Sequence, residues 1–127
     1  MTLTEAALAA RENARAPYSH FRVGAALEDE AGKIHTGCNI ENATYGLTIC
    51  AERVAVFKAI SEGARKFKRI AIAADTDDLT PPCGACRQIL WEFCGDLEVI
   101  LVNPRGKQQT HQMSALFPLP FSDRFFR

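Results

Sequence analysis

The segment Thr80 to Phe93, "TPPCGACRQILWEF", decides the architecture because it joins two short apolar runs through a predicted helix. The runs at 69–75, "RIAIAAD", and 97–103, "LEVILVN", are typical of buried strands, and residues 83–95 between them predict a helix. Strands that are connected through a helix usually lie parallel in one sheet. The segment therefore predicts a parallel strand pair, with Cys83 and Cys86 in the first turn of the connecting helix.

The remaining predicted elements are a helix at about 3–15, a hairpin of 21–29 and 33–40, and a helix at 50–63. Thr2 and Glu5 have the spacing of a capping box, while Gly63 and Gly95 follow the ends of two helices. The side chains expected on the inward helix faces are Ala51, Val54, Ala55 and Phe57, and then Ile89, Leu90 and Phe93. We predict an α/β fold, a three-layer α/β/α sandwich around a mixed, roughly five-stranded sheet, in a single domain spanning 1–127.

The composition excludes several classes of partner. The chain has 127 residues, with 15 Lys plus Arg and 15 Asp plus Glu, so it lacks the net positive charge that attracts nucleic acid or an anionic membrane. Residues 1–20 lack the apolar core of a signal peptide, which predicts a cytoplasmic protein. In a reducing compartment, five cysteines are more typical of metal ligands, catalytic thiols or buried apolar groups than of disulfides.

The cysteine pattern points to a metal centre. Cys83 and Cys86 are three residues apart, so both sulfurs lie on one face of the first helical turn, where the helix dipole favours thiolate. Alone, this pair is compatible with a redox dithiol, half of a structural zinc site or two buried residues. Cys50 begins the preceding predicted helix, close to Glu52. If the two helix starts converge, three sulfurs occupy three corners of a tetrahedron and leave the fourth to water.

Glu52 and two arginines are candidates for chemistry at this centre. A helix turns about 200° between residues i and i+2, so Cys50 and Glu52 can face one metal only if Cys50 lies at the cap position. Otherwise Glu52 is an acid that complements the helix dipole. Three thiolates on Zn²⁺ leave a net negative charge, and Arg53 or Arg87 can offset it by donating hydrogen bonds to sulfur, unless these are surface arginines. The cysteines and histidines that we do not expect to be ligands are Cys38, Cys94, His20, His35 and His111.

Larger motifs carry a family resemblance. Cys50-Ala51-Glu52 with Pro82-Cys83-Gly84-Ala85-Cys86 resembles the signature of the zinc nucleoside deaminases. With "APYSHFRVGAAL", "GCNIENATYG", "ICAERVAVFKAI", "PCGACRQILWEF" and "LFPLPF", nearly the whole chain is similar to the small cytidine deaminases with three cysteine ligands. The resemblance implies zinc-dependent hydrolytic deamination of cytidine and 2′-deoxycytidine to uridine and 2′-deoxyuridine, with release of ammonia, in pyrimidine salvage.

The resemblance also implies the residue roles. Cys50, Cys83 and Cys86 hold one zinc ion per subunit, Glu52 is the proton shuttle, and Arg53 compensates the charge of the thiolates. Phe21 stacks on the pyrimidine, Ala51 contacts the substrate, and the ribose 3′-hydroxyl shares hydrogen bonds with Asn39 and Glu41, the carboxylate of Glu41 accepting. The implied assembly is a homotetramer in which Phe121 reaches a neighbouring subunit's site.

Two alternatives are weighed against this reading. A deaminase of blasticidin S or of a modified-cytosine nucleoside shares the zinc motifs. Blasticidin S, however, has no ordinary ribose, whereas Asn39 and Glu41 are placed to bind one. A structural zinc module would close the site with Cys38 or Cys94 and would leave Glu52 without a role.

Overall fold

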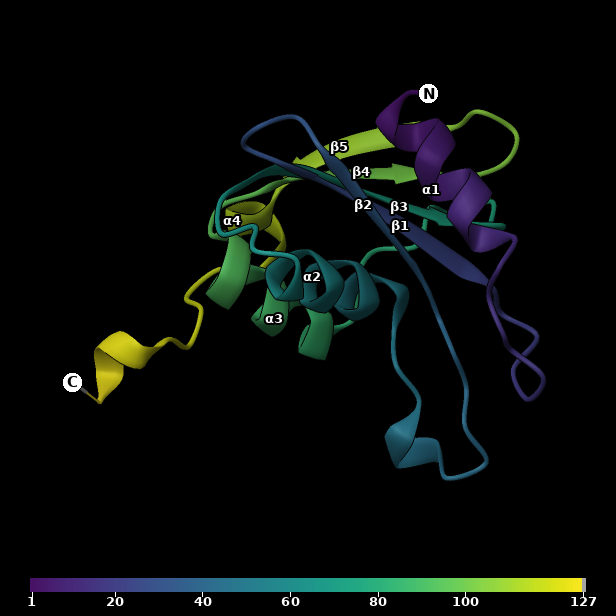
Figure 1. Cartoon of the computed structure of the whole chain (residues 1–127), viewed down its shortest axis with the longest axis horizontal. Coiled ribbons are helices and arrows are strands. Elements are labelled where there is room, and N and C mark those ends of the chain that lie inside the picture. The colour runs from purple at the N-terminus through teal and green to yellow at the C-terminus, as the bar shows by residue number, and fades with distance from the viewer. Residues whose placement is uncertain (127) are drawn as a thin grey trace.

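The computed structural model describes residues 1–126 and contains one five-stranded sheet with the strand order β2-β1-β3-β4-β5. Helices lie on both faces of the sheet (Figure 1). The strands are β1 (Val23–Asp29), β2 (Ile34–Cys38), β3 (Phe67–Ala74), β4 (Glu98–Val102) and β5 (Gln108–Gln112). The α-helices are α1 (Leu3–Arg11), α2 (Ala51–Ser61), α3 (Gly84–Cys94) and α4 (Met113–Leu116), with 3₁₀ turns at Tyr45–Leu47 and Asp123–Phe125.

Strand directions match the prediction of a mixed sheet. β1 and β2 form the antiparallel hairpin, and β3 and β4 are parallel across the α3 connection. β1 pairs antiparallel with β3, which joins the hairpin to the parallel pair at the centre of the sheet. β5 was not predicted from the sequence. This strand is polar and mostly exposed, so it carries none of the apolar alternation that reveals a buried strand.

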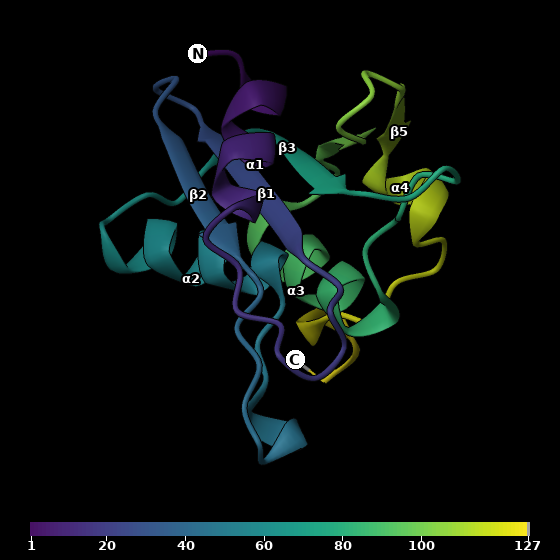
Figure 2. The same cartoon turned by 90° about the vertical axis from the view of Figure 1, so that its right-hand side faces the viewer.

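The helices form the two outer layers of the sandwich, as predicted. α1 covers one face of the sheet, and α2 and α3 lie together on the other (Figures 1 and 2). The core between the sheet and the α2–α3 layer contains Leu27, Ile70, Ile72, Leu90 and Val99, all fully or almost fully buried. Among residues 1–126, none of the helices combines the length and the apolar character required to traverse a lipid bilayer.

The first helix is shorter than predicted and ends at Arg11 rather than near residue 15. The backbone of Arg15 instead pairs with the 39–41 segment: its N–H donates to the Asn39 carbonyl at 3.0 Å, and its carbonyl accepts from the Glu41 N–H at 2.9 Å. A tertiary backbone pairing has thus overridden the local preference for helix. It also fixes the segment that carries Asn39 and Glu41.

The prediction that Phe57 and Phe93 face inward is wrong. Their exposed fractions are 40% and 42%, and their rings meet edge to face, with centroids 6.3 Å apart, on the outer side of the α2–α3 layer. Small side chains take the inward positions of α2, because the helix lies very close to β2. A Cβ on Gly37 would lie 2.6 Å from both the Ala51 carbonyl oxygen and the Ala55 nitrogen.

Candidate active site

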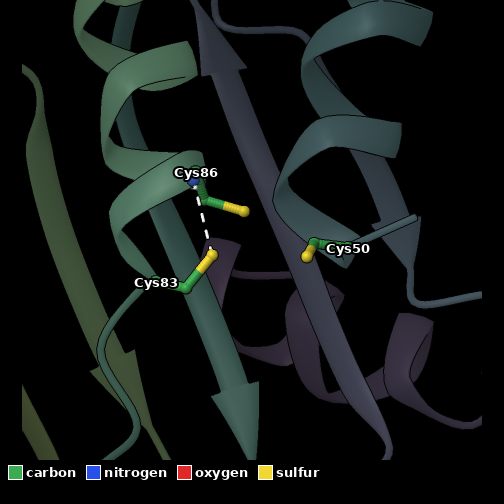
Figure 3. Close-up of side chains that lie close together, drawn as sticks. All are labelled: Cys50, Cys83 and Cys86. Atoms are coloured by element: carbon green, nitrogen blue, oxygen red, sulfur yellow. Dashed lines mark hydrogen bonds between the residues drawn. The ribbon is translucent and has the colours of Figure 1, made fainter. Parts of the chain in front are cut away.

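The starts of α2 and α3 converge, and they bring three cysteines together. Cys50 is the N-cap residue of α2, and Cys83 is the N-cap residue of α3. Cys86 lies in the first turn of α3, where its backbone N–H donates to the Cys83 sulfur at 3.5 Å. The three Sγ atoms lie within 4.8 Å of one another and point toward a common centre (Figure 3).

The surroundings of Cys50 favour the thiolate, whereas those of Cys86 favour the thiol. A hydrogen bond from the Cys86 thiol lowers the pKa of Cys50, and the same hydrogen bond, with burial, raises the pKa of Cys86. The Arg53 guanidinium donates to the Cys50 sulfur at 3.2 Å, which also lowers the pKa of Cys50. The Arg53 Nε atom is buried and has no hydrogen-bond partner within residues 1–126. The hydrogen bond from Arg53 to Cys50 thus places positive charge beside the sulfur cluster.

These donors fit one zinc ion. Zn–S bonds of about 2.3 Å in a tetrahedron put sulfurs about 3.8 Å apart, so a cluster within 4.8 Å needs only small side-chain rotations to close around the ion. Three thiolates leave one tetrahedral position open, which is typical of a catalytic rather than a structural zinc site.

Arg87 does not take the sulfur-binding role that we considered for it. Its guanidinium donates instead to the carbonyl oxygens of Pro82, at 2.8 Å, and Leu116, at 2.5 Å. Arg87 therefore ties the entry of α3 to the end of α4, and Arg53 alone supplies the guanidinium contact to sulfur among the described residues.

Glu52 is almost completely buried beside this cluster, with 6% of its surface exposed. Because Cys50 lies at the cap, outside the regular helix, Cys50 and Glu52 can line one cavity although they are two positions apart. Burial raises the pKa of Glu52 to about 7, and the negative charge of Cys50 acts in the same direction. A buried acid next to an electron-rich metal centre is suited to taking up and releasing protons.

A cavity of about 200 Å³ is lined by Cys50, Cys83 and Glu52. Its lining includes three further residues that we had singled out: Phe21, Asn39 and Ala51. Thr48 and Thr80 also line it, and the sequence offered no signal for either, because a threonine in a loop has no distinctive pattern. The cavity therefore combines an acid, an aromatic wall and polar groups around the sulfur cluster.

Asn39 lines this cavity, Glu41 lines an adjoining hollow, and both side chains already form hydrogen bonds within the protein. Asn39 accepts from the Val23 N–H at 2.9 Å and donates to the Phe21 carbonyl at 2.7 Å. Glu41 does not line the cysteine cavity itself but an adjoining hollow, and Thr48 belongs to both. A ligand that extends from the cysteine cavity across Thr48 would therefore reach Glu41.

Phe121 lies apart from the cavity of its own chain. Its ring is 59% exposed and stacks on Phe125 and Phe126, with centroid separations of 5.8 and 6.1 Å. This C-terminal segment extends away from the body of the molecule (Figure 1). Gln88 on α3 holds it by donating to the Phe121 carbonyl oxygen at 2.9 Å. The expected contact of Phe121 with a neighbouring subunit stays a prediction.

Comparison with known proteins identifies the family. Residues 1–102 match the model of the cytidine and deoxycytidylate deaminase zinc-binding region. The chain belongs to this deaminase family. Curated cytidine deaminases that it resembles include one from Sporosarcina psychrophila, 53% identical over 114 residues (89% of this chain and 84% of that protein). Another, from Halalkalibacterium halodurans, is 52% identical over 121 residues (94% and 92%).

Structural similarity supports the same family. The crystal structure of cytidine deaminase from Burkholderia pseudomallei matches with a TM-score of 0.91 and 49% identity, covering 95% of this chain and all of that one. A blasticidin-S deaminase from Bacillus cereus is more distant, at 30% identity over 108 residues (79% of this chain and 76% of that protein). The predicted fold class is therefore confirmed, and so is the resemblance on which the predicted activity depends.

Proposed function

We propose that the protein is a zinc-dependent hydrolase that converts cytidine and 2′-deoxycytidine to uridine and 2′-deoxyuridine with release of ammonia. The observation that carries the proposal is the burial of Glu52 in a cavity that is also lined by Cys50 and Cys83, two of the three converging cysteines. A closed structural zinc site has no use for a buried acid, whereas hydrolysis of an amino group requires protons to be moved.

In this proposal Cys50, Cys83 and Cys86 hold the zinc ion, which when bound acts as a Lewis acid that makes water a better nucleophile. Arg53 stabilises the negative charge on the sulfurs through its hydrogen bond to Cys50. Glu52 takes a proton from the attacking water and delivers it to ring N3. It then takes the proton of the hydroxyl group added at C4 and passes it to the amine, which leaves as ammonia while the C4 carbonyl forms.

Four residues orient the nucleoside. Phe21 forms an aromatic wall against which the pyrimidine stacks. The backbone N–H of Ala51, in the first turn of α2, has no partner within its helix and is a suitable donor to the ring carbonyl. Asn39 and Glu41 lie on the side toward the adjoining hollow, where they meet the ribose 3′-hydroxyl.

We further propose a homotetramer with composite active sites, in which Phe121 reaches the cavity of a neighbouring subunit. The exposed aromatic rings at the C-terminal segment and on the outer face of α2 and α3 support this assembly, because large exposed apolar side chains in groups are typical of interfaces. We also propose a cytoplasmic location, where a reducing environment keeps thiols available as zinc ligands. Nucleoside deamination there would serve pyrimidine salvage.

The substitution Glu52→Gln tests the catalytic assignment. It removes the titratable group and keeps the shape, so we expect the variant to fold and retain zinc while cytidine turnover falls by about two to four orders of magnitude. Glu5→Gln is the matched control, because Glu5 occupies the first turn of α1 and is exposed. Turnover near that of the wild type in Glu52→Gln would show that Glu52 merely complements its helix dipole.

Ammonia release from a panel of substrates tests the activity itself. The panel contains cytidine, deoxycytidine, cytosine, CMP, adenosine and blasticidin S, each incubated with the zinc-loaded protein. We expect turnover of the two cytosine nucleosides. Turnover of blasticidin S alone would favour the antibiotic deaminase, and zinc retained through dialysis without turnover of any compound would favour a structural zinc module.

Mixed oligomers test the composite site. Subunits carrying Phe121→Ala are mixed with subunits carrying Glu52→Gln, and the activity is compared with that of each variant alone. If Phe121 serves a neighbour, the mixture recovers activity, because some sites combine an intact acid with an intact phenylalanine. Activity in strict proportion to the two unmixed variants would show that each subunit works by itself.

A further inference from the structure

The loop from Ala16 to Arg22, which we call the Phe21 loop, is held by a carboxylate rather than by regular secondary structure. One oxygen of Glu41 accepts from the backbone N–H groups of Tyr18, at 2.9 Å, and Ser19, at 3.1 Å. The other oxygen accepts from the Ser19 hydroxyl. These bonds, with the Ser19 hydroxyl as the largest cause, lower the pKa of Glu41. Glu41 is thus the anchor of the loop.

Ser19 extends this anchor to Phe21. While its hydroxyl donates to Glu41, its oxygen accepts from the Phe21 N–H at 3.0 Å. The Phe21 carbonyl in turn accepts from the Asn39 side chain at 2.7 Å. Both backbone polar groups of Phe21 are therefore held by side chains, and one of these links leads directly to Glu41.

The loop needs these bonds because its local conformation is unfavourable. His20, between Ser19 and Phe21, has a φ of 59°, in the left-handed region that few residues other than glycine adopt. Such a conformation costs roughly 1 kcal/mol or more and persists only where the surroundings enforce it. Loss of the Ser19 hydroxyl removes two of the hydrogen bonds that hold the backbone around His20 in this conformation. The Phe21 ring then moves with the backbone.

Glu41 can hold the loop and a ligand at once. An ionised carboxylate accepts about four hydrogen bonds, and three donors are seen here. One acceptor position remains for a hydroxyl group that arrives from the adjoining hollow. The Glu41 carboxylate can therefore contact the sugar and, through Ser19, position the Phe21 ring on which the base stacks.

We propose that Ser19 is a positioning residue that couples Glu41 to Phe21 and so aligns the stacking ring with the pyrimidine when the ribose is bound. This inference rests on the proposed nucleoside deamination. It assigns Ser19 no contact with the reacting atoms. Its effect passes entirely through the orientation of Phe21.

A double-mutant cycle in kcat/KM for cytidine tests the coupling. Ser19→Ala should lower kcat/KM by roughly 10-fold, mainly through KM, since the hydrogen bond to the Glu41 carboxylate and the one from the Phe21 N–H are both lost. In a Phe21→Leu background, the same substitution should change kcat/KM by less than about 2-fold, because no ring remains to be aligned. Ser19→Thr, which keeps the hydroxyl, should restore most of the loss in the Phe21 protein.

Ser61→Ala is the matched control, because within residues 1–126 the Ser61 hydroxyl donates only to the Lys58 carbonyl at the end of α2. It should leave kcat/KM unchanged. If turnover in the Phe21→Leu background is too slow, calorimetric binding of uridine completes the same cycle. Ser19→Cys, whose thiol is a weak donor, replaces Ser19→Ala if that variant does not fold.

The outcomes separate this inference from the function on which it rests. A wild-type protein that does not deaminate cytidine overturns the proposed function. A wild-type protein that is active, together with equal losses from Ser19→Ala in both backgrounds, overturns the role of Ser19 alone. Failure of Ser19→Thr to restore activity while Ser19→Ala is impaired also overturns it, because the hydroxyl would then not be the group that matters.

Discussion

Gly37 keeps α2 close to β2, so the substitution Gly37→Ala should move Cys50 away from Cys83 and Cys86. A methyl group at position 37 points at the first turns of α2, where it would meet the Ala51 carbonyl oxygen and the Ala55 nitrogen. Both atoms belong to the helix backbone, which cannot rotate aside as a flexible side chain can. The helix itself must therefore retreat from the sheet.

The distance by which α2 must move follows from the contacts of the added Cβ at position 37. The added Cβ would lie 2.6 Å from both backbone atoms, and ordinary van der Waals contact begins at 3.4 Å, so the start of α2 must move by about 0.8 Å. Metal–ligand distances tolerate only about 0.2 Å. Cys50 is adjacent to Ala51, so we expect zinc affinity to fall at least about 10-fold, while overpacking costs roughly 1–3 kcal/mol of stability.

Gly24→Ala is the matched control on the opposite face. Its Cβ would lie 2.1 Å from the Ala7 carbonyl oxygen of α1, which is an even closer clash, but α1 carries no cysteine. Zinc affinity is measured by competition with a chromophoric chelator, and stability is measured by urea denaturation of the zinc-free proteins. We expect Gly24→Ala to lose at least as much stability as Gly37→Ala and to keep wild-type zinc affinity.

Two results would refute this reasoning. Wild-type zinc affinity in a folded Gly37→Ala protein would show that the position of α2 does not control the cluster. Equal loss of zinc affinity in both variants would show that general destabilisation, rather than displacement of Cys50, weakens the site.

Three further predictions concern charge and packing. Arg53→Gln should fold but lower zinc affinity by about 10- to 100-fold in the same chelator competition, because it removes the hydrogen bond to the Cys50 sulfur; unchanged affinity would contradict this role. The hydrogen bond from His35, at 2.9 Å, lowers the pKa of Asp29 below the ordinary 3.8, so its contribution to stability is present above that value and is lost as the pH falls through the lowered pKa. Urea denaturation of the zinc-free protein below about pH 4 should then show a shallower loss of stability for Asp29→Asn than for the wild type, and parallel curves would count against it. Leu90→Ala, at a fully buried position, should cost about 2–5 kcal/mol in urea denaturation, and a cost below about 1 kcal/mol would mean that the core collapses around the gap.

Most of the secondary structure could be predicted from local sequence signals, because helix caps, turns and side-chain periodicity depend only on neighbouring residues. Thr2 does cap the first helix by accepting from the Glu5 N–H at 3.2 Å, and Gly95, with a φ of 70°, ends α3. The errors arose where tertiary contacts prevail. Arg15 pairs with the 39–41 segment instead of extending the helix. Phe57 is exposed because the buried face of α2, which packs on the sheet, is formed largely by alanines.

The same division holds for the candidate site. Cys50, Cys83 and Cys86 were recognisable because cysteines at helix starts form a compact motif, and the structure brings them together. Ser19 and Thr80 gave no signal, since single hydroxyl residues in loops are common. Their importance depends on which side chains lie across the fold, and spacing along the chain does not encode that.

By itself, the sequence determined the helices, the apolar strands, the placement of three thiols at helix starts and the family to which they belong. Each of these follows from side-chain periodicity, cap chemistry or a contiguous motif, and such features act over a few neighbouring residues. Only the tertiary structure decided that Cys50 meets Cys83 and Cys86, that Arg53 rather than Arg87 contacts sulfur, and that Glu41 holds the Phe21 loop. These contacts depend on strand order, on the close approach of α2 at Gly37 and on the directions in which side chains leave the backbone, all of which are set when distant segments pack together.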